Sequence, residues 1–354
     1  MTLAQRYVSI LNEEWKDVFA DRRTHRRAVE HALAWPSAMG DRTISQDICM
    51  LGRSQQDWSA DYKMYSRSPW NAEQLFDPVI DEYLKRYPKG PVVMPMDDTK
   101  VHKTGRHIPG ASWQRDPMSP PFHVNFIWGL RFLQASLVFP HHQEGNFSAR
   151  AFPELFTPED VRKSDRCEWK HTRIYFGTKR RKVGYKVLDN VLWRRGAATR
   201  HLRLIVIAPV PYKMSTHSHI NYRDPAYLLS TDLKTSPKKL LQHYFDRWQI
   251  EVNHRDEKTI LAVGHSQVWS PLSVPRQPAF TVACYSTLLL SCLRHSGPGR
   301  TPDFAPLPKW RNSQPNRPSL QDMLTLLRKN LCETSVSCML DVNFGENITI
   351  YAKT

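Results

Sequence analysis

The sharpest change of pattern in this chain lies at Pro88-Lys89-Gly90-Pro91, and it constrains the fold more than any other feature. Before this boundary, apolar side chains recur at helical spacing, and no stretch alternates as a strand would. Directly after it, residues 92–96 form a short apolar run, typical of a buried strand, that leads into Asp97-Asp98-Thr99. A helical first part followed by strands indicates an α/β chain with two or three structural units.

Strand-like and helical patterns alternate in blocks beyond the boundary. Strands are expected at 123–128, 130–138, 172–176, 182–186, 202–208 and 226–229. Long helices are expected at 236–259 and 279–293. The segment 296–318 is rich in proline and is expected to be a linker, after which Ser319 is a suitable N-cap for a last helix that ends near Leu331.

The chain is strongly basic. Lys and Arg total 50 against 34 Asp and Glu, which gives a net charge of +16 and a pI of about 9.7. Such an excess favours polyanionic partners, of which nucleic acid is the commonest, although composition leaves a basic protein without such a partner equally open. Two dense basic runs, residues 22–27 and 179–182, fit phosphate binding and fit solvent-exposed charged faces equally well.

Cysteine usage and hydropathy indicate a cytoplasmic protein. The six cysteines include no CxxC pair and have no histidine at zinc-finger spacing, which indicates reduced thiols. The first residues continue into a charged helix rather than an apolar signal core. No apolar stretch reaches the roughly 20 residues of a membrane span, so we expect no membrane association.

A helix, a glycine turn and a second helix are expected at Ile44–Gly52 and Ser54–Tyr65. This layout suits a helix-turn-helix, whose second helix enters the major groove of DNA. An ordinary pair of packed helices has the same sequence pattern and is the more frequent explanation.

The helix expected at 236–259 carries four chemically active side chains: Tyr244, Arg247, Glu251 and Lys258. They lie three, seven and fourteen residues after the first, so a single helix projects them from one face. In this arrangement Glu251 would bind a divalent metal, while Arg247 and Lys258 would hold phosphates. The alternative is a salt-bridged solvent face with an Arg247–Glu251 pair, and spacing alone favours this alternative.

The pattern Tyr244-x-x-Arg247-x-x-x-Glu251, completed by Lys258, resembles the YREK signature of insertion-sequence DDE transposases. The surrounding segments, residues 244–253 and Asp256-Glu257-Lys258, resemble sequences of the same family. The strand that ends in Asp97-Asp98-Thr99 resembles the family's D-x-T motif, in which the first acid is catalytic. A plain turn explains the Asp pair if the resemblance is set aside.

This resemblance implies an RNase H-like mixed sheet interrupted by a β-rich insertion, in which Asp97 and Glu251 are catalytic metal ligands and Tyr244, Arg247 and Lys258 contact DNA phosphates. Asp98 is a weaker candidate, because neighbouring strand residues point to opposite faces. The implied cofactor is Mg²⁺ or Mn²⁺ in a two-metal site that cleaves and transfers DNA strands. The implied partners are the terminal inverted repeats of an element, its target DNA and a second copy of the chain, in the nucleoid of a bacterial cytoplasm.

The second catalytic Asp of such a site is not evident. Residues 139–169 show neither a clear helix nor a strand ending in an acid, and Asp165 stands in charged, turn-like surroundings. We interpret the gap as an internal deletion that leaves DNA affinity with little or no transposition, or a non-catalytic DNA-binding remnant that regulates a related transposase. The alternative is that Asp165, Asp160, Glu144 or His142 replaces the missing ligand from a loop.

These expectations divide the chain into five parts. They are a helical DNA-binding part at 1–88, a shortened first part of the catalytic core at 89–169, the β-rich insertion at 170–232, the second part of the core with the YREK helix at 233–295, and the linker with the last helix at 296–354. Within the insertion, Trp193, Arg194 and Arg195 fit a stacking and phosphate-binding group as well as they fit a structural role.

Overall fold

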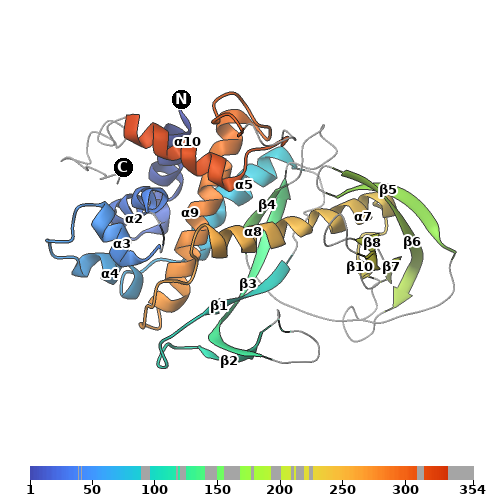
Figure 1. Ribbon diagram of the computed structural model, residues 1–354, viewed down its shortest axis with the longest axis horizontal. Helices are drawn as coiled ribbons and strands as arrows, with labels where there is room; N and C mark the ends of the chain where they lie inside the picture. Colours follow the sequence, from blue (N-terminus) through green and yellow to red (C-terminus); the bar gives the residue numbers. More distant parts are fainter. Residues whose placement is uncertain are drawn as a thin grey trace. The chain divides into compact units, whose positions relative to one another are not determined.

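The computed structural model forms two compact units, one made of Met1–Phe156 with Ile250–Thr354 and the other of Thr157–Gln249 (Figure 1). The residues that it describes are 1–38, 40, 42–88, 96–116, 119, 125–139, 150–154, 168–176, 179–192, 201–208, 211–212, 219–222, 226–308 and 315–333. We call the first unit 1 and the second unit 2.

Helices form the N-terminal part of unit 1, as the sequence predicts. They are α1 (Leu3–Ser9), η1 (Ile10–Glu14), η2 (Lys16–Val18), α2 (Arg22–Ala34), η3 (Trp35–Ser37), α3 (Ile44–Met50), α4 (Ser59–Ser66), η4 (Glu73–Phe76) and α5 (Asp77–Arg86). Side chains cap several of them: Thr2 and Gln5 form a capping box at α1, and Asp21 accepts a hydrogen bond from the Thr24 amide at α2.

The centre of unit 1 is α9 (Ser273–Ser296), most of whose residues are buried. Phe280 of α9 meets the rings of Trp15, Tyr65 and Trp70 at centroid distances of 5.7, 5.6 and 6.4 Å. The last helix, α10 (Leu320–Glu333), starts after Ser319, whose hydroxyl accepts a hydrogen bond from the Asp322 amide. The predicted N-cap is therefore confirmed.

Unit 1 also contains a four-stranded sheet made of β1 (Met96–His102), β2 (Ser112–Arg115), β3 (Phe126–Phe139) and β4 (Arg150–Glu154). Its order is β1-β3-β2, with β4 paired to the far part of β3. The two strands predicted at 123–128 and 130–138 are one long strand, β3, because Gly129 continues the ladder opposite His102.

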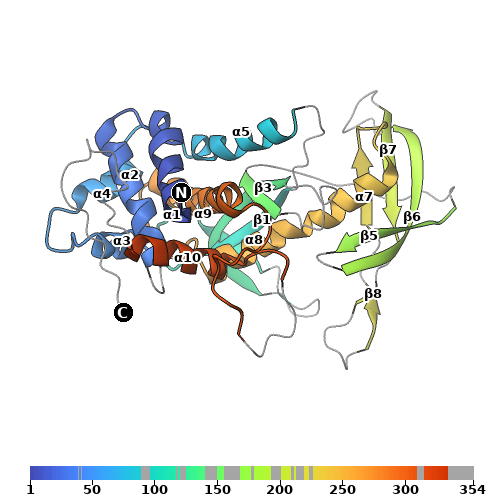
Figure 2. The same ribbon diagram turned by 90° about the horizontal axis from the view of Figure 1, so that it is seen from above.

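Unit 2 consists mainly of strands, and a helix covers one face of its main sheet (Figure 2). Its strands are β5 (Lys170–Phe176), β6 (Lys179–Leu192), β7 (His201–Ile207), β8 (Pro211–Tyr212), β9 (Asn221–Tyr222) and β10 (Ala226–Ser230), and its helix is α7 (Pro237–Asp246). The main sheet has the order β10-β7-β6-β5, and β8 pairs with β9. Ile174, Val183, Ile205 and Ile207 form the core against Leu241 of α7.

Two details of the predicted fold are corrected. The single helix predicted at 236–259 is two helices, because α7 ends at Asp246 and α8 (Trp248–Thr259) begins after Arg247. Every strand pair in the described part of the chain is antiparallel, whereas a mixed sheet was predicted. The coarser prediction, an α/β chain with an N-terminal helical part, is confirmed.

Over the residues that the structure describes, none of the helices combines the length and the apolar character needed to cross a bilayer.

Candidate functional site

Asp97 lies at the start of β1, directly opposite Gln134 of β3. Because residues alternate between the faces of a strand, Asp97 shares its face with Thr99 and Val101. Those two side chains are buried, whereas Asp97 is partly exposed at the edge of the buried area. The backbone of Asp98 pairs with Leu133, and its side chain lies outside the described part of the structure.

A buried hydrogen bond joins this sheet to α8. The Gln134 side-chain amide donates to a carboxyl oxygen of Glu257 at 2.9 Å, and both side chains are less than a tenth exposed. Burial raises the pKa of Glu257 to about 8, and it outweighs the opposing effects of Gln134 and Lys258. Glu257 is therefore a protonated, neutral acid at neutral pH, which suits a contact with a neutral amide.

The direction of α8 follows from two further contacts. The Lys103 ammonium, just beyond the end of β1, donates to the backbone carbonyls of Gly264 at 2.6 Å and Ser266 at 2.7 Å, beyond the C-terminal end of α8. Helix and strand therefore run in the same sense. Glu251, in the first turn of α8, lies toward the end of β1 that carries Asp97.

The two faces of α8 differ in chemistry. Asn253 and Glu257, four residues apart, are buried, and the Tyr285 hydroxyl donates to the Asn253 side chain at 3.3 Å. Glu251 and Lys258, seven residues apart, share another side, where Glu251 is partly exposed and Lys258 is exposed. The second pair is the one that the sequence predicts.

Tyr244 and Arg247 belong to unit 2, whereas Glu251 and Lys258 belong to unit 1. Within unit 2, the Arg247 guanidinium lies 5.8 Å from the centre of the Tyr244 ring, and Tyr244 packs against the core between α7 and the sheet. The four side chains predicted for one helical face are thus shared between two units.

Metal coordination is incomplete within the described residues. Among them, no three or more His, Cys, Asp and Glu side chains are arranged to hold a metal ion. Asp97 and Glu251 supply carboxylate oxygens, the donors that Mg²⁺ and Mn²⁺ prefer, so these two residues suit part of a site. The weaker candidate Asp165 lies outside the described residues, as do Asp160, Glu144 and His142.

The predicted helix-turn-helix forms a helix pair with a longer connection. The second helix, α4, begins at Ser59 rather than Ser54, because Gly52 takes a positive φ of 68° and residues 51–58 turn before the helix starts. Asp61 of α4 is buried and accepts hydrogen bonds from His31 at 3.0 Å and from Arg27 at 3.1 Å. The inner side of α4 therefore supports an ionic cluster.

His31 is the centre of this cluster. Burial lowers the pKa of His31, but its hydrogen bonds to Asp47 and Asp61 outweigh burial and raise the pKa above its usual value. Burial likewise raises the pKa of Asp61, and His31, Arg27 and Arg53 together lower it below the usual value. The raised pKa of His31 favours its charged form, and the lowered pKa of Asp61 favours the carboxylate, whereas burial raises the pKa of Asp47.

Unit 2 presents an exposed basic face, of which only the run at 179–182 is evident in the sequence. We call it the basic hairpin face; it lies on the side of β5 and β6 opposite α7 and consists of Trp169, just before β5, with His171, Arg173, Tyr175, Arg180, Lys182 and Lys186. Neither β5 nor the first ten residues of β6 contain a carboxylate. The group Trp193, Arg194 and Arg195 lies outside the described residues.

Aromatic rings support the cations of this face. The Arg180 guanidinium lies 5.0 Å from the Tyr175 ring centre, and the Lys186 ammonium lies 4.9 Å from that of Trp169, which is 46% exposed. Arg173 stands directly opposite Lys182, and like charges in this position destabilise a strand pair. A polyanion between them would relieve this repulsion.

No protein-family model matches this chain. A search of the curated proteins returned no match either.

Proposed function

We propose that this chain is a DNA-binding protein of the DDE transposase type, in which Asp97 and Glu251 hold the divalent metal ions for strand cleavage and transfer. The observation that carries the proposal is the anchoring of α8 on the β1–β3 pair through Gln134 and Glu257. It directs the two proposed carboxylates toward the same end of neighbouring elements. The resemblance of the sequence around them to the transposase signature supports the assignment.

The proposed roles follow from residue chemistry. Asp97 and Glu251 would hold Mg²⁺ or Mn²⁺, which would supply the activation of an attacking hydroxyl and the stabilisation of the leaving oxygen. Lys258, exposed on the same side of α8 as Glu251, holds a neighbouring phosphate. The basic hairpin face binds the DNA backbone through its cations and stacks on bases through Trp169.

A second candidate function is a non-catalytic DNA-binding protein that regulates a related transposase. It is supported by the ligand set, since the described part of the chain holds no group of three or more His, Cys, Asp and Glu side chains placed to bind a metal ion. A site that lacks one of its cooperating ligands loses most of its rate. Both candidates require DNA binding, and only the first requires cleavage.

The deciding experiment is nicking of a labelled duplex that carries the DNA flanking this chain's own gene, in Mg²⁺ and in Mn²⁺. Asp97→Asn and Glu251→Gln keep the side-chain shape and remove the charge, and Asp81→Asn on the exposed side of α5 is the matched control. Cleavage that only the first two variants abolish establishes the transposase assignment. Metal-independent binding without cleavage establishes the regulatory assignment, and absence of DNA binding contradicts both.

A further inference from the structure

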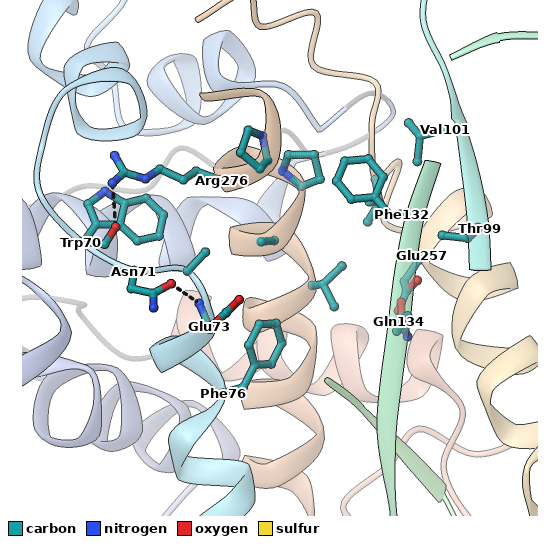
Figure 3. A pocket seen from close by; sticks show the side chains of 16 residues that line it. Trp70, Asn71, Glu73, Phe76, Thr99, Val101, Phe132, Gln134, Glu257 and Arg276 are labelled. Carbon is teal, nitrogen blue, oxygen red and sulfur yellow. Dashed lines mark hydrogen bonds between the residues drawn. The ribbon is translucent and has the colours of Figure 1, made fainter. Parts of the chain in front are cut away.

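Unit 1 encloses a cavity of about 400 Å³ between the β1–β3 face, the N-terminal part of α9 and the segment that leads into η4 (Figure 3). Most of its wall is apolar and includes Trp70, Phe76, Val101, Phe132, Pro278 and Val282. An apolar cavity of about 150 Å³ accommodates benzene, so this cavity has room for a fused bicyclic molecule. Volumes of this size are typical of sites for small organic ligands.

Polar groups converge at one side of the cavity. Glu257, Gln134 and Thr99 lie there together, across from Trp70 and Arg276 (Figure 3). All three are at least nine-tenths buried. The Thr99 hydroxyl is buried and has no hydrogen-bond partner among the described residues, and an unsatisfied buried hydroxyl is costly. A polar ligand group at this side would satisfy it.

The opposite wall is already fixed. Arg276 donates hydrogen bonds to the backbone carbonyls of Ser68 at 2.8 Å and Trp70 at 2.7 Å, and its guanidinium lies 5.0 Å from the Trp70 ring centre. The Arg276 guanidinium thereby fixes the position of the wall at Ser68 and Trp70. The cavity is therefore preformed, which lowers the entropic cost of binding a ligand.

We propose that this cavity is a binding site for an uncharged, planar, bicyclic molecule with an amide-like edge, whose donor and acceptor pair with Glu257, Gln134 and Thr99. A neutral Glu257 carboxyl offers a hydroxyl donor beside the oxygen that accepts from Gln134, and a cyclic amide presents the matching acceptor and donor. An anionic ligand would meet the buried carboxyl of Glu257, and the Arg276 cation across the cavity already donates to the backbone carbonyls of Ser68 and Trp70, so a neutral ligand fits better. This inference does not depend on DNA binding or cleavage.

Binding is expected to weaken as the pH rises through about 8, the pKa to which burial raises Glu257, because an ionised carboxylate no longer donates. The charged groups around Glu257 are Asp256 and Lys258 on its own helix, Asp97 beside Gln134 on the sheet, and Glu73 and Arg276 across the cavity.

The test is isothermal titration calorimetry of the full chain with the bicyclic lactam carbostyril. Saturable binding with one site per chain is expected. Ala279→Phe, which fills the cavity from α9 without touching the polar side, should weaken binding at least about tenfold, because the ligand and the new ring occupy the same space. Glu257→Leu should lower the affinity for carbostyril by about tenfold, because two hydrogen bonds are lost. Glu257→Gln should keep the affinity within about threefold of that of the unmodified chain, and its affinity should no longer depend on pH.

Three bicyclic probes of similar size serve as controls. Naphthalene lacks the amide edge, naphthoate carries a negative charge, and naphthylmethylamine carries a positive charge. Each is expected to bind at least about tenfold more weakly than carbostyril. Absence of carbostyril binding, or equal affinity in Ala279→Phe, would overturn the proposal. Tighter binding of the amine would overturn the assigned ligand class, because an ion pair with Glu257 would then be the recognition element.

Discussion

The two basic runs of this chain are alike in sequence, and the structure uses them differently. In the run at 22–27, Arg26 pairs with Glu30 at 2.9 Å and Arg27 with Asp61 at 3.1 Å, and only Arg22 and Arg23 are exposed. In the run at 179–182, on β6, Arg180, Arg181 and Lys182 are exposed.

This difference between the two runs shows that the role of a basic residue depends on whether a carboxylate lies within reach of it. The first run contributes to a buried ionic cluster that holds α2 and α4 together, because carboxylates of other helices reach it. The second run lies on β6, its paired strand β5 contains no carboxylate, and Lys182 of the run stands opposite the like-charged Arg173 of β5. The first run therefore stabilises unit 1, and the second is available to a polyanion.

The largest expected effect comes from removing the buried anion that the first run depends on. Asp61→Ala would leave Arg27, Arg53 and His31 without their shared carboxylate, and breaking a buried ion pair costs about 3–5 kcal/mol. Urea unfolding measures the free energy directly. Asp81→Ala, at an exposed carboxylate on α5, is the control and should change it by less than about 0.5 kcal/mol. Equal effects of the two variants would contradict a structural role for the cluster.

A second prediction concerns a buried acid whose partner is neutral. Folded Glu257 has a raised pKa of about 8, so between roughly pH 5 and pH 8 the folded chain holds a proton that the unfolded chain has lost. The free energy of unfolding therefore falls as the pH rises through this window, and the fall ends above it. Glu257→Gln removes this contribution, so its free energy of unfolding relative to the unmodified chain should rise by about 4 kcal/mol across the window. Parallel curves of unfolding free energy against pH would contradict it.

Sequence patterns predict the existence of the helices and strands better than the residues at which they begin and end. The N-terminal helices, the N-cap at Ser319 and the β-rich block follow from local spacing and capping chemistry, which a single sequence contains. The helix break at Arg247 does not follow, because the pattern of apolar residues continues through it. The division between units falls close to this break and separates side chains that spacing alone would group.

Candidate site residues can be proposed from the sequence only where a motif resembles a known one. Asp97 and Glu251 are proposed in this way and stay predictions, whereas the sequence does not single out the buried pair of Glu257 and Gln134. Glu257 looks like a solvent-facing residue among Asp256 and Lys258, and its burial depends on Gln134, more than a hundred residues away. The ion pair between Arg27 and Asp61 likewise joins residues 34 positions apart, so the spacing of residues within a helix does not predict it.

The third prediction tests the second run and its neighbours. Combined Arg173→Ala and Lys182→Ala should lower DNA affinity by about tenfold and reduce the salt dependence by about two counterions, because each cation contacts a phosphate. The same change should not lower the free energy of unfolding, since it removes a repulsion between opposite strand residues. Fluorescence anisotropy over a salt series measures the affinity. Combined Arg22→Ala and Arg23→Ala is the charge-matched control in the first run, and an equal loss in the control would make the DNA effect one of net charge alone.

The smallest expected effect separates neighbours within the first run. Arg26 pairs with Glu30 one helical turn away within α2, whereas Arg27 joins α2 to Asp61 of α4. Both partner carboxylates are buried, so the two pairs differ in the elements that they join. Arg26→Gln should therefore lower the free energy of unfolding by only about 0.5 kcal/mol, because an i,i+4 pair within one helix contributes about this much. Arg27→Gln should cost more, since it removes a contact between two helices. If urea unfolding gave the two variants the same cost, the contact between helices would not be what distinguishes these residues.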